Sequence, residues 1–146
     1  MENTRKHLKI SSIIVLIFAC ATLINIVSEL LLGELNNTEL PAGAPVNTLL
    51  ITKIIVMAVM FVCLLPQVYI GIKGIKVAKN PDSSRGHIIW GTILLVFAAI
   101  GLISPLLAVI QQGFAFENVS ELLSIAVEVA VFYDYVKYAK AVQKEN

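Results

Sequence analysis

Residues 49–87 read LLITKIIVMAVMFVCLLPQVYIGIKGIKVAKNPDSSRGH, a long apolar run that ends in basic residues and a turn. As a helix, the apolar part, residues 49–72, is long enough to cross about 30 Å of hydrocarbon at about 1.5 Å per residue. Short loops rich in Lys and Arg stay on the cytoplasmic side of a membrane. This stretch therefore predicts a membrane span that ends in the cytoplasm. The basic residues that follow the span are Lys73, Lys76, Lys79 and Arg85.

Three more apolar runs of spanning length occupy residues 9–32, 88–110 and 119–138. Every Lys and Arg except Lys53 lies before or at the start of the first run, between the second and third, or toward the C-terminal end of the chain. With alternating helix directions, these three stretches fall on one side of the membrane, and the positive-inside rule makes that side cytoplasmic. The sequence thus predicts an all-α integral membrane protein with a single domain. We expect an antiparallel, up-down four-helix transmembrane bundle with both termini in the cytoplasm.

The composition independently favours a membrane protein. The chain is 58% hydrophobic and 14% charged, with a mean hydropathy of +0.84, whereas an average soluble domain has about 25% charged residues. The first run is longer than the apolar part of a signal peptide, so we expect it to remain as a span. A short chain of 146 residues without a eukaryotic sorting signal favours a multi-pass protein of a bacterial cytoplasmic membrane.

The most costly residue in the predicted spans is Glu128, near the middle of residues 119–138. A carboxylate at the bilayer centre costs about 2.5 to 3.5 kcal/mol on insertion scales, so it should face the protein interior. Thr22 and Asn25 lie at similar or slightly outer depth and share a face of the first helix. We expect these three residues to form an intramembrane polar cluster. Two interpretations stay open: a neutral carboxyl that hydrogen-bonds across helices, or a proton or cation relay.

Two further polar groups are expected at other depths. Glu29 and Lys53 lie toward the outer side of consecutive helices and are predicted to form an ion pair, although Lys53 could also snorkel to the interface or bind a ligand. Gln67 and Asp134 reach similar depths toward the inner side and are predicted to form an inner polar group. Asp134 also has a local partner in Lys137, three residues further along the helix.

Aromatic and basic residues near the inner side are expected to contact lipid. Tyr69, Tyr133, Tyr135 and Trp90 are predicted to form an interfacial belt. The basic inner residues, Lys73, Lys76, Lys79 and Arg85, are predicted to face anionic lipid rather than nucleic acid, because they flank the membrane.

Helix shape and packing are expected to depend on a few prolines and small residues. Pro66 and Pro105 remove backbone donors inside spans and are predicted to bend them. Gly71, Gly74 and Gly101 are predicted to allow close approach of neighbouring helices.

No motif for an enzyme is present. Cys20 and Cys63 form no Cys-x-x-Cys pair and are expected to pack as small apolar side chains. His7 and His87 fall at the inner edge of the spans and are predicted to be solvated, which disfavours a haem site. No ligand spacing for zinc and no Gly-rich phosphate loop is visible, so neither a metal nor another cofactor is expected.

The sequence therefore favours a non-enzymatic membrane protein that works by association, as a homo-oligomer or as a small subunit of a larger membrane complex. The alternative is a small oligomeric transporter or channel, coupled to protons or cations, that uses the Glu128 carboxylate. No motif in the chain identifies a substrate.

Overall fold

The protein is described by a computed structural model over residues 2–32 and 46–144; the side chains of Glu29, Leu32, Val46 and Leu49 lie outside the description. The described residues form helices and short turns, without a strand, which confirms the all-α prediction. The helices are α1 (Glu2–Leu32), α2 (Val46–Lys79), α3 (Gly86–Gly101), α4 (Ile103–Gln112) and α5 (Phe116–Lys144).

Three helical stretches within the described residues are long and apolar enough to cross a membrane: Glu2–Ser28, Leu50–Lys79 and Gly86–Gln112. They correspond to the first three predicted spans, which supports the membrane class. The predicted fourth span, residues 119–138, is not among them, although it is helical within α5. The reason is its charge, because acidic residues are distributed along the whole apolar part of α5. These residues are Glu117, Glu121, Glu128 and Asp134.

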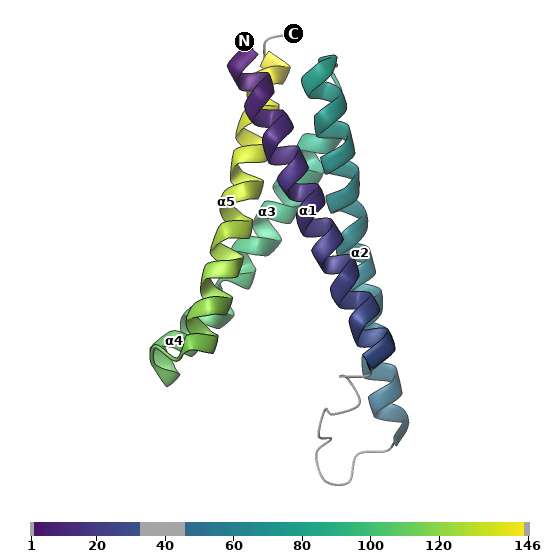
Figure 1. The fold of residues 1–146 in the computed structure, drawn as a ribbon, viewed down its shortest axis with the longest axis vertical. Helices are drawn as coiled ribbons and strands as arrows, with labels where there is room; N and C mark the ends of the chain where they lie inside the picture. The colour runs from purple at the N-terminus through teal and green to yellow at the C-terminus, as the bar shows by residue number, and fades with distance from the viewer. Residues whose placement is uncertain (1, 33–45, 145–146) are drawn as a thin grey trace.

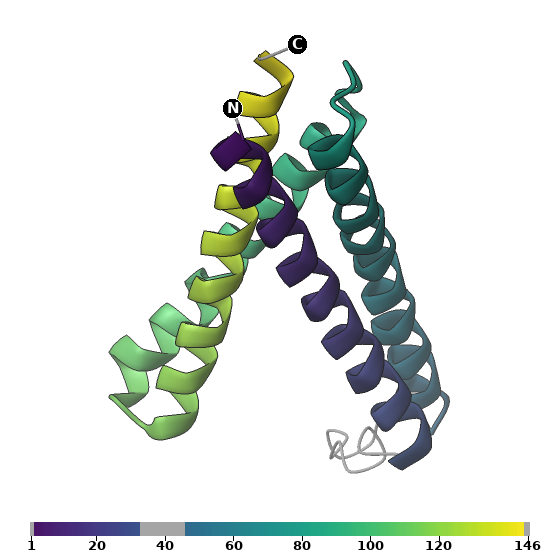
Figure 2. The ribbon, with the colours of Figure 1, turned by 45° about the horizontal axis from the view of Figure 1, so that its top comes forward.

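The helices form two packed groups that meet at one end of the molecule and diverge toward the other (Figure 1). The chain runs along α1, returns along α2, runs out again through α3 and α4 and returns along α5, so that both termini lie near the meeting point. A view turned by 45° shows the same divergence (Figure 2). We call the end with the termini the joined end and the opposite end the open end. In a closed bundle, all the long helices would pack together along their whole length. Here they do so only at the joined end.

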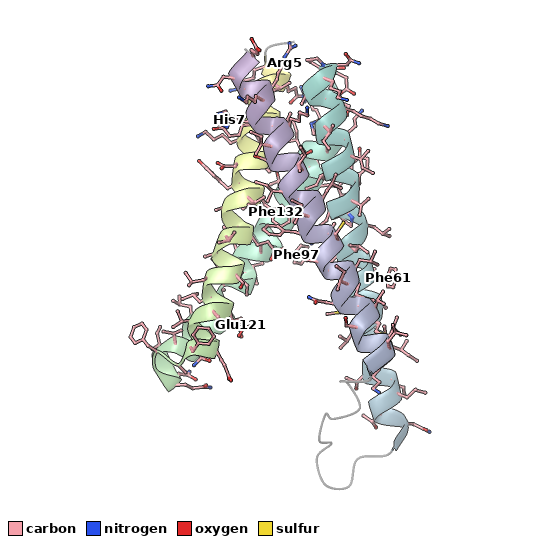
Figure 3. The ribbon with its side chains drawn as sticks, in the orientation of Figure 1. Arg5, His7, Phe61, Phe97, Glu121 and Phe132 are labelled. Atoms are coloured by element: carbon pink, nitrogen blue, oxygen red, sulfur yellow. The ribbon has the colours of Figure 1, made fainter. Side chains whose placement is uncertain are left out.

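The buried core explains this shape. Its larger part joins all the long helices at the joined end and includes Leu8, Ile70, Ile88 and Phe132, whereas a smaller part holds only α1 against α2. Phe132, 1% exposed, lies where the two groups separate (Figure 3). Membrane helices lack a hydrophobic drive toward one another, so they depend on close contacts at small residues.

Pro105 behaves as predicted. The third apolar run is interrupted at Leu102, which separates α3 from α4, and Pro105 follows three residues later. Because proline has no N–H, it cannot donate to the carbonyl of Gly101. Pro66, in contrast, lies inside α2, which continues without interruption to Lys79.

Candidate functional site

The strongest concentration of buried polar groups lies at the joined end, around Tyr135 of α5. The ring of Tyr135 is fully buried and packs between two glycines. A Cβ atom on Gly74 of α2 would lie 2.7 Å from this ring, and one on Gly91 of α3 would lie 3.0 Å from it. Real Cβ contacts are rarely that short, so the absent side chains make room for the ring. The prediction that Tyr135 belongs to an interfacial belt is wrong, because it is a core residue.

One hydrogen bond joins this ring to α2, and a buried hydroxyl of α1 lies close by. The Tyr135 hydroxyl donates to the backbone carbonyl of Ile70 on α2 at 2.9 Å. Ser12 of α1 is also fully buried, and its hydroxyl donates to the Leu8 carbonyl at 2.6 Å. The Ser12 Oγ atom occupies the space where a Gly74 side chain would begin. Gly74 therefore lies at the contact of α1, α2 and α5, as the small-residue prediction requires.

Gly71 gives a second close approach on the same helix. A Cβ atom there would lie 2.5 Å from Cγ of Leu16 and 3.3 Å from the Ser12 carbonyl oxygen, both on α1. Gly101 differs, since a Cβ atom there would meet only Ile125, at an ordinary 3.9 Å. The prediction of close approach is thus confirmed for Gly71 but not for Gly101.

His87 lies at the start of α3 and is 1% exposed, so the prediction that it is solvated is wrong. Its ring contacts Tyr135 edge-on, with ring centroids 6.4 Å apart. Both ring nitrogens are buried, and neither has a hydrogen-bond partner within residues 2–32 and 46–144. His7 does lie near the surface, where it is exposed and stacks on Tyr138 at 4.9 Å.

Gln67 also belongs to the buried core, being 6% exposed, and its Oε1 atom has no partner in the described part of the chain. Asp134, its expected partner, is exposed on α5. The structure therefore does not bring the predicted inner polar group together. Gln67 precedes Ile70, the hydrogen-bond partner of Tyr135, by three residues. Both residues therefore lie on the same buried face of α2.

An ion pair closes the turn between α2 and α3. The Lys73 ammonium lies 2.5 Å from the Oδ2 atom of Asp82, and the backbone N–H of Ser84 donates to the Oδ1 atom of Asp82 at 3.1 Å. The hydrogen bond from Lys73 is the main reason why the pKa of Asp82 lies below its ordinary value. Lys73 is half-buried and paired, so its description as a lipid-facing loop residue is wrong.

The other basic residues in the predicted inner group are exposed. Lys76 and Lys79 lie in the last turns of α2 and not in a loop, and Arg85 immediately precedes α3. Their exposure fits the prediction that they face lipid headgroups or water.

The predicted intramembrane cluster is dispersed in a single chain. Glu128 is half-buried on α5, Asn25 is exposed on α1, and the Thr22 hydroxyl donates to the Phe18 carbonyl of its own helix at 3.0 Å. No hydrogen bond among the described residues joins Glu128 to Thr22 or Asn25. Figure 3 shows Glu121 on the diverging part of α5, away from α1 and α2. The cluster stays a prediction.

The predicted outer ion pair lies partly outside the description, because the side chain of Glu29 is not described. Lys53 is half-buried on α2. The pair stays a prediction.

Sequence reasoning missed the role of Tyr135 and His87, although a signal was present. Gln67, Gly71 and Gly74 recur at intervals of three or four residues on α2, as do His87 and Gly91 on α3. Such spacing places small and polar residues on one helix face, which is typical of a packed interface.

No group of three or more His, Cys, Asp or Glu residues that could hold a metal ion occurs in the described ranges. Cys20 and Cys63 are exposed on α1 and α2, which differs from the packing role predicted for them.

Comparison with protein family models, curated proteins and solved structures gives no match to this chain. Its function is therefore argued from its own residues.

Proposed function

We propose that the chain is an antiparallel four-span membrane protein, with both ends in the cytoplasm, that works by associating with a second copy or another membrane protein. The fourth span in this proposal is the apolar part of α5, residues 119–138. The orientation rests on the basic residues that gather at the joined end, including Lys79, Arg85 and Lys140.

The observation that carries association is the exposed face of α5 in the diverging half. Leu123 is 60% exposed and Val127 is 53% exposed, and Ala130 continues the same stripe at the next helical interval. This stripe belongs to a helix with several acidic residues, one of which, Glu128, is half-buried. Lipid alone is a poor environment for such a helix, since polar groups in spans face protein or water.

A partner helix would complete the contacts that α1 and α2 do not provide there. Small side chains such as Ala130 permit close approach of a partner helix. This makes the diverging half, rather than the tightly packed joined end, the surface for association.

The experiment is a mass measurement of the purified protein in mild detergent and in lipid nanodiscs by light scattering. Association predicts a protein mass of at least twice 15.9 kDa, or a stoichiometric co-purifying membrane protein. Leu123→Trp combined with Val127→Trp should reduce that mass. The matched control is Ile54→Trp, which changes an apolar residue of α2 that is 59% exposed. A monomer without a partner in both media would contradict the proposal.

A second candidate, a small oligomeric transporter for protons or cations, is supported by the order of polar groups along the helices. From the inner end the groups are the pair of Lys73 and Asp82, then His87 and Tyr135. Gln67 lies seven residues from Gly74, and Glu128 lies seven residues from Tyr135, both toward the open end. This places Gln67 and Glu128 at a similar depth, about 10 Å beyond the Tyr135 contact.

Flux measured in proteoliposomes separates the two candidates. The transporter predicts proton or cation flux that Glu128→Gln abolishes while folding and oligomer mass stay unchanged, because the amide keeps the shape of the acid but cannot exchange its proton. Thr52→Val, a polar change at an exposed position of α2, serves as the control. Stable assembly without flux supports association alone.

A further inference from the structure

A groove between α3 and α5 at the joined end combines an apolar floor with a basic rim. It consists of two adjoining hollows of about 530 and 340 Å³, which share Ile88, Ile89 and Lys140. The first hollow continues along α3 over apolar side chains, and the second opens among basic side chains near the chain's C-terminal end.

The apolar part follows one face of α3. Ile89, Ile93, Val96 and Phe97 recur at helical intervals and line it, together with Thr92. From Ile89 to Phe97 the helix rises about 12 Å. These apolar side chains are exposed, and Phe97 at the far end is 67% exposed, so the floor is open to the hydrocarbon of the membrane.

The basic rim consists of Arg85, Lys140 and Lys144. Lys140 and Lys144 are four residues apart and share a face of α5. All three side chains are exposed, and none forms an ion pair with an acidic residue of the described ranges. The nearby Asp82 is already neutralised by Lys73.

A hydrogen bond links the two sides of this rim, and a helix N-terminus adds positive charge to it. The side-chain amide of Gln143 donates to the Ser83 carbonyl at 3.5 Å, which links the end of α5 to the turn that carries Arg85. The N-terminus of α3 begins directly after Arg85 and has no side-chain cap. Its partial positive charge adds to that of the rim.

We infer that this groove binds an anionic phospholipid of the membrane leaflet at the joined end. Its phosphate would lie among Arg85, Lys140 and Lys144, and one acyl chain would lie along Ile89, Ile93 and Phe97. Basic pockets between membrane helices bind anionic headgroups in this way. The inference does not depend on the proposed association, since a single chain forms the whole groove.

Two other hollows in the described structure lack either a basic rim or an apolar floor. The hollow between α2 and α3, lined by residues that include Val62, Pro66 and Trp90, has no basic residue. The hollow near the N-terminus is basic through Arg5, Lys6 and Lys9, but it also contains Glu2 and only one apolar residue, Ala78. The α3 and α5 groove, in contrast, aligns an apolar floor with a rim of cations.

The test measures lipid binding to the purified full chain in detergent by native mass spectrometry, with dioleoyl phosphatidylglycerol and dioleoyl phosphatidylcholine as probes. We expect one phosphatidylglycerol to remain bound preferentially. Lys140→Gln combined with Lys144→Gln should weaken that binding about 25-fold, since each basic residue near a membrane surface contributes about a fivefold factor. The control, Lys6→Gln with Lys9→Gln, removes the same charge from exposed residues of α1 and should leave the binding unchanged.

If the double variant does not fold, as judged by circular dichroism and monodispersity, Lys144→Gln alone should still weaken binding about fivefold. Equal losses in site and control variants would overturn the inference in favour of a diffuse basic surface. Equal binding of the two lipids would also overturn it. Inorganic phosphate that displaces phosphatidylglycerol at comparable concentration would show a phosphate site without a lipid chain, and would equally contradict the proposal.

Discussion

At the scale of single residues, the contact of Tyr135 with Gly74 and Gly91 joins α5 to α2 and α3. The sequence places a tyrosine near the inner end of a span, where interfacial tyrosines are common. Nothing local distinguishes a tyrosine that faces lipid from one that faces two glycines on other helices. Tyr133, two residues earlier, is 56% exposed and fits the expected belt, whereas Tyr135 does not.

This contact predicts a strong difference between two glycine substitutions. Gly74→Ala should destabilise the fold by about 1 to 3 kcal/mol, because the new methyl group would meet Ser12 and the Tyr135 ring. Gly101→Ala has open space and should be neutral or slightly stabilising, since alanine favours helix. Thermal unfolding of both variants in the same detergent checks the prediction. Equal effects of the two substitutions would show that the close approach at Gly74 is not important for stability.

At the scale of elements, the length and hydropathy of the first three runs predict their helices well. The third run was predicted as one helix bent at Pro105, whereas it is divided between α3 and α4 at Leu102; Pro105 removes a donor that an uninterrupted helix needs. The basic stretch after residue 72 was expected to be a loop, yet α2 continues through it to Lys79. Lysines favour helix and complement the negative C-terminal end of a helix, so apolar content alone underestimates its length.

The turn between α2 and α3 gives a prediction about pH. Lys73 lowers the pKa of Asp82, so their pair stabilises the folded state above the unfolded pKa of the carboxyl, about 3.9. This contribution is lost as the pH falls through the lower folded pKa. Asp82→Asn should therefore lower the Tm at pH 6, and its deficit relative to the original protein should shrink at pH 3. A deficit of the same size at both pH values would mean that the ion pair is not its cause.

At the scale of the whole molecule, the helical class and the membrane character follow from composition, but the divergence of the two groups does not. Packing between spans depends on which small residues meet, and the close contacts of Gly71, Gly74 and Gly91 all lie toward the joined end. The contacts of the predicted polar residues could not be predicted from the sequence either. The sequence placed Gln67 and Asp134 at similar depths, but Gly74 meets Tyr135, so Gln67 lies about 9 Å nearer the open end than Asp134. The ends of the apolar runs do not fix how two helices are aligned along their axes.

The proposed orientation predicts opposite labelling of two positions in the chain. Cysteines introduced singly at Thr38 and Ser84, in a background that lacks Cys20 and Cys63, should respond differently to an impermeant thiol reagent applied to intact cells. Position 38 should react and position 84 should react only after lysis, because basic residues hold the α2 and α3 turn inside. Labelling of position 84 from outside would reverse the orientation.

The central claim, association through the exposed face of α5, is tested most directly by cross-linking in native membranes. Cysteines at Leu123 or Val127, in the same cysteine-free background, carry a photoreactive benzophenone, and a cysteine at Ile125 is the control because that residue packs toward Gly101 of its own chain. The account predicts adducts with a second copy or another membrane protein from positions 123 and 127, and far fewer from position 125. Only the 15.9 kDa chain, with no protein adduct at positions 123 and 127, would contradict it.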